Sequence, residues 1–312
     1  MSSARSAIRV LVTGGTGFVG RPTVEALIGR GFEVHVATRA GDPSSVPDQA
    51  IAHRANLLEA DAARTIIAAV APHTVLHLAW SVTPGRFWTD PSNLDWIAAS
   101  LRLARAAAEG GALRFIGVGT CFEYDWPADS PCVEGETPIC THTLYDAAKA
   151  SLAASLRPYF AGAGVGFAWA RLFYLYGPGE NARRFAPSLA RSLVRGEPAL
   201  CTRGLPVRDF LDVRDAGAAL AALAASDYRG DVNVGSGASI RLADVAARLA
   251  TLAGRRDLLQ LGALPDRPEE PPFVVADTRI LRKTIGFAPR FDLDAGLRAA
   301  LEYWARLEGC DA

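Results

Sequence analysis

Short runs of β-branched and other apolar residues alternate with helical stretches rich in alanine, leucine and arginine through the first half of this chain. Each apolar run is nearly continuous, which is typical of strands buried on both faces of a parallel sheet. Strands and helices in this order predict a doubly wound α/β fold, a parallel Rossmann sheet with right-handed crossovers. We expect strands at 10–12, 34–36, 75–78, 115–118 and 166–173, with helices at 22–31, 61–71, 93–110 and 145–163 between them.

The alternation changes after Tyr176, where loops rich in proline and glycine separate helices expected at 185–195, 213–225 and 242–253. We therefore expect a dinucleotide-binding domain over residues 1–176, with residues 209–235 packing back onto it. Most of residues 177–312 should form a smaller, interleaved substrate-binding lobe. A chain of 312 residues, half of them hydrophobic, is long enough for both parts.

Charge and composition argue against several other classes of protein. The formal net charge is zero and no run of like charges occurs, so we expect neither nucleic-acid nor membrane-surface binding. The short polar N-terminus lacks a secretion signal, and no apolar run approaches the length of a membrane span. Five cysteines without paired ligand spacing indicate reduced thiols in a cytoplasmic enzyme and no metal site.

Three glycines follow the first expected strand directly. Gly14, Gly17 and Gly20 fall on a G-x-x-G-x-x-G spacing between that strand and a helix. Gly14 permits a tight turn, Gly17 lets the backbone approach a pyrophosphate, and Gly20 allows close packing of the helix, whose positive N-terminal end faces the phosphates. In this context the pattern predicts a dinucleotide site.

The end of the second expected strand indicates which dinucleotide is preferred. A site for NAD places a carboxylate there to accept the ribose 2′-hydroxyl. Here the strand ends in Thr38 and Arg39, and the nearest acid, Asp42, lies beyond Gly41. Because a guanidinium suits a 2′-phosphate, we expect NADP(H) to be preferred, with NAD(H) possible.

The candidate reacting residues are Tyr145, Lys149 and Thr120. The i, i+4 spacing of Tyr145 and Lys149 places both side chains on one face of a helix. We expect the ammonium, together with an oxidised nicotinamide, to lower the pKa of the phenol so that it can exchange protons near neutral pH. Lysine is rare in this chain, occurring only at 149 and 283. Thr120 follows a strand at the sheet edge where ligands bind, and its hydroxyl could orient a substrate oxygen.

With these residues the sequence resembles the extended short-chain dehydrogenase/reductase family, the NAD-dependent epimerase and dehydratase group, over about residues 8–304. The resemblance extends to Asn56-Leu57, His77-Leu78-Ala79, the segment 171–178, Arg208-Asp209-Phe210 and Asn233-Val234-Gly235. It implies that Arg208 and Arg267 contact a substrate diphosphate and that helices 93–110 and 145–163 form a homodimer interface. For the cofactor we expect contacts with Gly14, Gly17, Phe18, Val19, Gly20, Thr38, Arg39, Asn56, Leu57, Leu78, Ala79, Trp80, Tyr145, Lys149, Phe173 and Leu175, and for the substrate with Ser81, Cys121, Phe122, Tyr174, Arg184, Arg208 and Arg267.

Departures from the family pattern narrow the expected activity. Relatives that eliminate water carry Asp-Glu after the active-site threonine, whereas this chain has Cys121-Phe122. The pattern around Thr120 and Tyr174 is similar to that of reductases of nucleotide-activated 4-keto-6-deoxy sugars, which implies NADPH-dependent reduction at C4. Three alternatives stay open: a nucleotide-sugar 4-epimerase with tightly bound NAD, a non-catalytic NADP-sensing protein, and a reductase of a non-sugar carbonyl compound.

Overall fold

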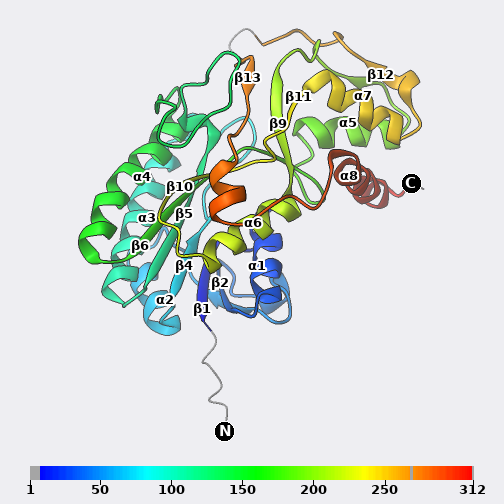
Figure 1. The fold of residues 1–312 in the computed structure, drawn as a ribbon. Coiled ribbons are helices and arrows are strands. Elements are labelled where there is room, and N and C mark those ends of the chain that lie inside the picture. Colours follow the sequence, from blue (N-terminus) through cyan, green and yellow to red (C-terminus); the bar gives the residue numbers. More distant parts are fainter. Residues whose placement is uncertain (1–7, 268–269, 311–312) are drawn as a thin grey trace.

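Figure 1 shows the computed structural model, which describes residues 8–267 and 270–310. The outermost residues of the two expected domains, 1–7 and 311–312, lie outside the described residues. Seven parallel strands form the central sheet in the order β10-β6-β5-β4-β1-β2-β3, which confirms the expected doubly wound α/β fold. The strands are β1 Arg9–Thr13, β2 Glu33–Thr38, β3 Ile51–Arg54, β4 Thr74–His77, β5 Arg114–Thr120, β6 Gly166–Leu172 and β10 Gly230–Val234.

The strand order reverses between β1 and β4. From β1 the chain first builds outward through β2 to β3, then returns to add β4, β5 and β6 on the other side. Loops that leave the carboxyl ends of β1 and β4 therefore diverge and leave a crevice between them, which is where open α/β sheets bind ligands.

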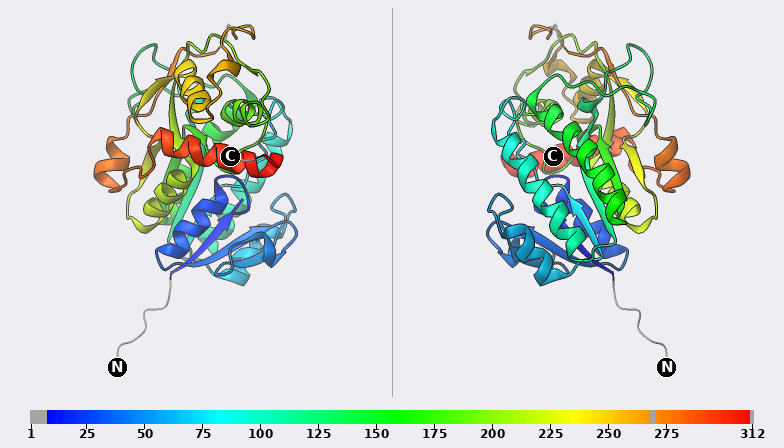
Figure 2. Two further views of the ribbon diagram at one scale, coloured as in Figure 1. Left: turned by 90° about the vertical axis from the view of Figure 1, so that its right-hand side faces the viewer. Right: turned by 90° about the vertical axis from the view of Figure 1, so that its left-hand side faces the viewer.

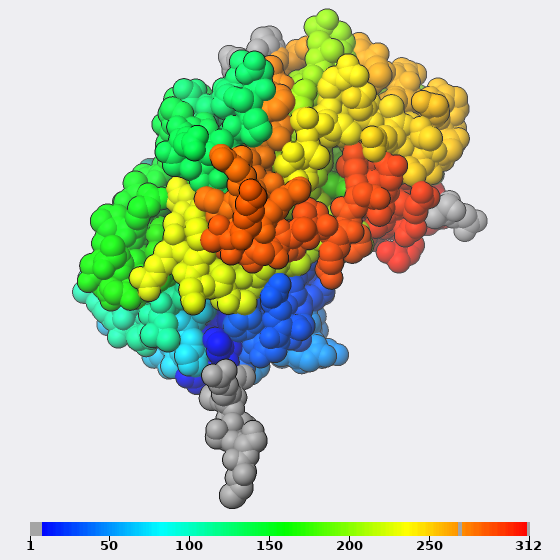
Figure 3. All heavy atoms as spheres, viewed as in Figure 1, coloured from blue at the N-terminus to red at the C-terminus, as the bar shows by residue number. Residues whose placement is uncertain are grey.

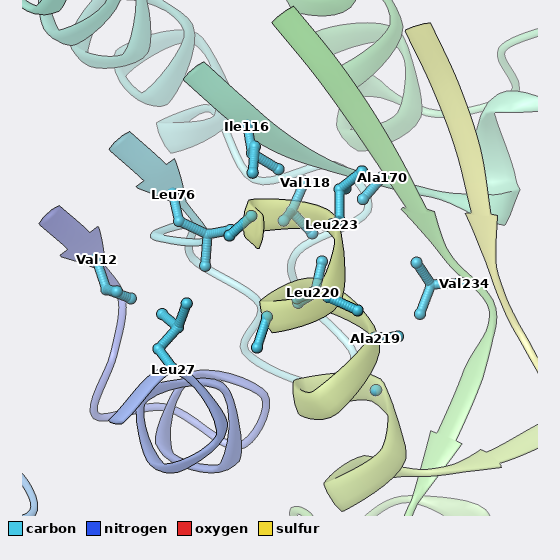
Figure 4. Packing of buried hydrophobic residues seen from close by; sticks show 14 of the residues in the cluster. Val12, Leu27, Leu76, Ile116, Val118, Ala170, Ala219, Leu220, Leu223 and Val234 are labelled. Atoms are coloured by element: carbon cyan, nitrogen blue, oxygen red, sulfur yellow. The ribbon is translucent and has the colours of Figure 1, made fainter. Parts of the chain in front are cut away.

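Helices cover both faces of this sheet, as the alternation of buried side chains requires. Val10 and Val12 of β1 pack with Leu27 on one face, and Leu11 packs with Ile66 on the other. Figure 4 shows the first of these faces, where α6 lies beside α1 over the strands. Full burial of each such side chain contributes about 1.5–3 kcal/mol, so a strand that slipped by one residue would lose several contributions at once. The helices are α1 Gly20–Gly29 and α6 Val213–Ala225 on one face, and α2 Ala62–Val70, α3 Ser92–Glu109 and α4 Leu144–Ala163 on the other, where α3 and α4 run side by side (Figure 2).

A smaller lobe, built mostly from residues after β6, occupies the upper right of the molecule in Figure 3. Its core packs α5 Phe185–Val194, α7 Leu242–Leu252 and α8 Leu293–Glu308 together. The expected returning segment 209–235 divides between the two parts. Its first residues belong to β9 Val207–Asp212, which pairs within the small lobe, whereas α6 packs on α1 and β10 pairs with β6. The strands of the lobe are β7 Tyr174–Tyr176, β8 Ala199–Leu200, β9, β11 Ser239–Arg241, β12 Leu259–Gln260 and β13 Phe273–Val274.

Across residues 8–267 and 270–310, none of the helices has the length and apolar character that a membrane crossing needs.

Candidate active site

The turn between β1 and α1 has the geometry that the glycine spacing predicts. Gly14 has φ of +72°, and a Cβ at that position would stand 2.8 Å from the backbone nitrogen of Ala79, in the loop after β4. A Cβ at Gly20 would overlap the carbonyl oxygen of Gly14. Only glycine fits these two positions, because the turn folds onto itself and onto the end of β4. Gly15, which the spacing argument did not use, is also confined, since its Cβ would lie 2.6 Å from Val36.

The start of α1 has no side-chain cap, although Arg21 N donates to the Gly17 carbonyl at 3.0 Å and Pro22 has no N–H. Val19 is the N-cap residue, and neither a capping side chain nor an acidic residue in the first turn occupies the helix end. Phe18 lies against the Gly179 turn that follows β7. A helix N-terminus of this kind, preceded by a glycine turn with no room for side chains, fits the diphosphate of a dinucleotide.

At the end of β2, Thr38 is buried and its hydroxyl accepts a hydrogen bond from Gly41 N at 2.8 Å. Arg39 is exposed. The Asp42 carboxylate accepts hydrogen bonds from Ser44 N at 2.9 Å and Ser44 Oγ at 2.8 Å, so it caps its own short turn. Those hydrogen bonds lower the pKa of Asp42 and hold its carboxylate away from the role of a ribose ligand.

Arg39 shares a cavity of about 720 Å³ with Arg54, the last residue of β3. Register pairs Arg54 with Thr38 on the neighbouring strand, so the two guanidinium side chains arise from adjacent strand ends. Asn56 also lines this cavity, and its amide donates to Glu59 at 3.1 Å. Leu57, another expected cofactor contact, is instead buried in the core that α2 covers.

Thr120 ends β5, and Tyr145 lies in the first turn of α4. The helix begins at Leu144 because Thr143 and Asp146 cap it reciprocally, with Thr143 N donating to Asp146 Oδ1 at 3.0 Å. Both Thr120 and Tyr145 are buried. Burial raises the pKa of the Tyr145 phenol, and nearby Glu123 adds to the rise, whereas a hydrogen bond with the Thr120 side chain opposes it.

The expected lowering of the Tyr145 pKa, which also invokes an oxidised nicotinamide, is opposed in this structure by burial of the phenol. Lys149 Nζ donates to the Val118 carbonyl at 2.8 Å and lies 3.9 Å from the centre of the Trp80 ring. Burial lowers the pKa of Lys149 to about 7, and Glu123 opposes that effect. The ammonium is thus one turn from Tyr145, as the spacing predicts, but burial of the phenol determines the direction of its pKa.

His77 supports this region from the end of β4. Its Nδ1 shares a hydrogen bond with Thr13 Oγ1 at 2.7 Å, and its Nε2 shares one with Ser100 Oγ at 2.8 Å. Burial, and secondarily Lys149, lowers the pKa of His77 to about 3, so the ring is neutral. Ala79 N donates to the same threonine hydroxyl at 3.3 Å, which fixes the loop that carries Leu78 and Trp80.

Aromatic rings surround Tyr145. Phe122 contacts Trp88 with ring centres 4.8 Å apart and lies 6.0 Å from the ring of Tyr174. Phe87 meets Tyr145 edge-on at 4.9 Å. Phe87 and Trp88 are absent from the residues expected from sequence, and the available signal was a pair of aromatics in the loop between β4 and α3. These rings give the site an apolar wall.

The other expected substrate residues differ in exposure. Ser81 and Tyr174 are partly exposed, and the ring of Tyr174 lies beside Phe122. Cys121 is buried in a cluster with Tyr124, Cys132 and Phe173, and burial raises the pKa of its thiol. The expected substrate contact by the Cys121 side chain is therefore not supported.

Leu175, an expected cofactor contact, lies in β7 and is partly buried.

The three expected arginines have different surroundings. Arg184 is exposed and its guanidinium lies 5.6 Å from the Phe87 ring, which itself contacts Tyr145. The Arg208 side chain is fully buried; it pairs with Glu270 at 2.9 Å and stacks on Tyr174. Arg267 is exposed on the loop that carries Glu270. The structure therefore does not bring Arg208 and Arg267 together as a pair of free cations.

Among residues 8–267 and 270–310, no cluster of His, Cys, Asp or Glu side chains is arranged to hold a metal ion.

Comparison with known proteins shows the family and supports the assignment of fold. The model of the NAD dependent epimerase/dehydratase family matches residues 10–235. UDP-glucuronic acid decarboxylase 1 of Arabidopsis thaliana is 26% identical over 304 residues, covering 94% of this chain and 69% of that protein. A 3-diazoavenalumate denitrifying reductase of a Streptomyces species is 31% identical over 225 residues, covering 69% of this chain and 72% of that protein.

A solved structure agrees over nearly the whole chain. The UDP-glucose 4-epimerase of Thermus thermophilus, in complex with NAD, superposes with a TM-score of 0.83 at 25% identity and covers 95% of this chain and 99% of that one. Because the family model spans well over half of the chain, including the glycine turn, Thr120, Tyr145 and Lys149, this protein is an enzyme of the NAD-dependent epimerase/dehydratase family, the extended short-chain dehydrogenases/reductases.

Proposed function

We propose that this chain is an NADPH-dependent reductase of a nucleotide-activated 4-keto-6-deoxy sugar, with hydride transfer to C4. The proposal is carried by two buried side chains, Thr120 at the carboxyl end of β5 and Tyr145 in the first turn of α4, with Cys121 and Phe122 directly after the threonine. Thr120 orients the substrate carbonyl, and Tyr145 donates a proton to the oxygen as negative charge develops there. Bound NADPH supplies the hydride.

The residues after Thr120 favour simple reduction over elimination. Cys121 is buried and Phe122 is an aromatic wall residue, so neither can act as the acid or base that removal of water needs. A tyrosine phenol is protonated near neutral pH, and burial raises the pKa of Tyr145 further, so the phenol is in the form that a proton donor requires.

A preference for NADPH is supported by the charges around the end of β2. Arg39 and Arg54 line one cavity, and the nearby carboxylate of Asp42 is engaged by Ser44. The acids in the cavity also have partners, since Glu59 accepts from Asn56 and Asp61 pairs with Arg64. Two guanidinium groups thus face a space that suits a 2′-phosphate.

A panel of nucleotide-linked 4-keto-6-deoxyhexoses, followed by NADPH oxidation, tests the proposal. A reductase consumes one NADPH for each sugar reduced. A 4-epimerase, the activity of the solved relative, would instead carry NAD through purification and turn over without added cofactor. The second result would replace reduction by epimerisation as the activity of this site.

A reductase of a non-sugar carbonyl compound is a second candidate. Two observations favour it: the Arg208 guanidinium is already paired with Glu270, and Phe87, Trp88 and Phe122 line the site with aromatic surface. One relative is named as a reductase of a compound that is not a nucleotide sugar. Oxidation of NADPH by planar aromatic aldehydes or enones, with none by the sugar panel, would favour this candidate.

We also propose that the enzyme is a homodimer formed through α3 and α4. Leu94 and Leu101, seven residues apart on α3, are exposed, as is Tyr159 on α4. Residues at this spacing lie on one face of a helix, and an apolar face on two adjacent helices suits a four-helix interface. Sedimentation of the protein at several concentrations tests this proposal.

A further inference from the structure

Glu123 is a fully buried acidic residue that the proposed mechanism has not used. It ends the short 3₁₀ turn Cys121–Glu123 after β5. Its Oε1 accepts a hydrogen bond from Thr120 N at 2.9 Å, while Thr120 Oγ1 accepts one from Phe122 N at 3.3 Å. These two bonds form a reciprocal cap, so the backbone of Thr120 is held by the carboxylate of Glu123.

The neighbouring strands are shaped to hold Glu123 in this position. Register in the sheet places Gly117 of β5 opposite Trp169 of β6, and a Cβ at Gly117 would overlap the indole ring. A Cβ at Gly119 would overlap both the indole nitrogen and Glu123 Oε1. The two glycines therefore leave room for Trp169, whose Nε1 donates to Glu123 Oε2 at 3.0 Å and Oε1 at 3.2 Å.

Glu123 is bound as a carboxylate. Arg171 Nε donates to its Oε2 at 2.7 Å, and the other two partners, Thr120 N and Trp169 Nε1, are also N–H donors. A protonated carboxyl would direct its own O–H at one of these donors. Burial raises the pKa of Glu123, and Arg171 with the N–H donors opposes that rise. Arg171 also contacts Asp231, with Nη1 to Oδ2 at 2.9 Å.

The charge of Glu123 acts on both expected reacting groups of α4. Burial lowers the pKa of Lys149, and the charge of Glu123 opposes that effect. Burial raises the pKa of Tyr145, and the charge of Glu123 raises it further. The other groups that face Lys149 are neutral: the ring of His77, the Val118 carbonyl and the Trp80 indole. Glu123 is therefore the acidic group placed to keep Lys149 protonated.

Two further groups face Tyr145 and act in opposite directions. The buried Cys121 thiol adds to the rise of its pKa, and the exposed Arg184 guanidinium reduces it. Neither forms the hydrogen bonds to the β5 turn that Glu123 forms.

We propose that Glu123 is a positioning residue for the reaction: its carboxylate fixes Thr120 and supplies the negative charge that keeps Lys149 an ammonium. The inference rests on the proposed function, in which Thr120 orients the substrate carbonyl. Removal of the charge lowers the pKa of Lys149. The enzyme should then lose activity at a lower pH than the parent enzyme.

The test that needs no substrate is NMR of protein labelled with ¹³C at lysine Cε. Lys149 and Lys283 are the only lysines of the chain, so two signals are expected, and Lys149→Met identifies the buried one. In Glu123→Gln the midpoint of the Lys149 titration should move to lower pH, while that of exposed Lys283 stays in place. An unchanged or higher midpoint for Lys149 would overturn the proposal.

Kinetics supply a second readout. The ratio of kcat/KM at pH 8 to that at pH 6 should fall on the order of tenfold in Glu123→Gln, because a nearby opposite charge typically moves a pKa by about one unit or more. Trp169→Phe is the matched control: it removes one donor to Glu123 but leaves the charge, so its pH profile should follow that of the parent. If Trp169→Phe shifts the profile as much as Glu123→Gln does, the effect is one of packing and the proposal fails.

Glu123→Gln leaves Arg171 without its buried partner and could fail to fold. The double variant Glu123→Met with Arg171→Met removes both charges and keeps similar volumes, a replacement that buried ion pairs often tolerate. The Lys149 midpoint should fall here too, by less than in Glu123→Gln because the positive charge of Arg171 is also removed. A midpoint at or above that of the parent in this folded variant also overturns the proposal. If the parent enzyme reduces no carbonyl compound, the proposed function fails, while the lysine titration still decides the role of Glu123.

Discussion

Gly20→Ala should sharply weaken dinucleotide binding. An added methyl group would overlap the Gly14 carbonyl oxygen and stand 2.7 Å from Gly15 Cα. Both contacts are with backbone of the same tight turn, so neither can be relieved by rotating a side chain. Overpacking of this kind costs about 1–3 kcal/mol. If the turn opens to accept the methyl group, that cost appears in binding, and the Kd for NADPH should rise roughly 5- to 150-fold.

Gly29→Ala is the matched control in the same helix. No atom lies within 4 Å of a Cβ at Gly29, which ends α1 and is exposed. Alanine is a better helix former than glycine by up to about 1 kcal/mol, so this variant should bind NADPH like the parent and unfold at an equal or higher temperature. Isothermal titration with NADPH and thermal unfolding of both variants give the comparison. Parent-like NADPH affinity in Gly20→Ala would refute the steric argument for the turn.

Other parts of the molecule give three more predictions. Arg39→Ala should weaken NADPH binding on the order of tenfold or more and leave NADH binding unchanged, while the control Arg64→Ala should change neither affinity. Fluorescence titration measures both affinities, and an equal loss for NADH would argue against a 2′-phosphate contact. The buried Lys149 has a pKa of about 7 against an ordinary 10.5, so above pH 7 the folded state binds fewer protons than the unfolded state. The free energy of unfolding of the parent, relative to Lys149→Met, should therefore rise between about pH 7 and pH 10 in urea titrations, and a fall would contradict the assigned burial. Exchange of Leu94 and Leu101 for aspartate should convert dimers to monomers in sedimentation, and unchanged dimers would place the interface elsewhere.

Local patterns were sufficient to predict the fold and much of the site. Val10 and Val12 face one helical layer while Leu11 faces the other, so a continuous apolar run does identify a strand buried on both faces. The glycine spacing predicts the turn because the steric demands at Gly14 and Gly20 are local. The i, i+4 spacing of Tyr145 and Lys149 likewise survives in α4, since a helix fixes that geometry by itself.

What could not be predicted depends on contacts between distant segments. The ion pair of Arg208 with Glu270 joins residues 62 positions apart, so the motif at 208 gives no sign that its guanidinium is occupied. The rise of the Tyr145 pKa follows from burial by several elements, which no helical spacing reports. The sequence carries only a weak indication of the Glu123 site. Gly117 and Gly119 lie two residues apart in β5, so one face of that strand lacks side chains and leaves room for others. Trp169, the partner of Glu123, lies 46 residues later.

The proton on Tyr145 is the most direct test of the whole account. With NADPH and the nucleotide-linked 4-keto-6-deoxyhexose that the parent reduces fastest, kcat should fall on the order of 10² to 10⁴ in Tyr145→Phe, the usual contribution of a positioned general acid. The Kd for NADPH should stay at the parent value, because the ring itself is retained. A Tyr145→Phe enzyme that reduces the sugar at the parent rate would contradict the assignment of this phenol as the proton donor.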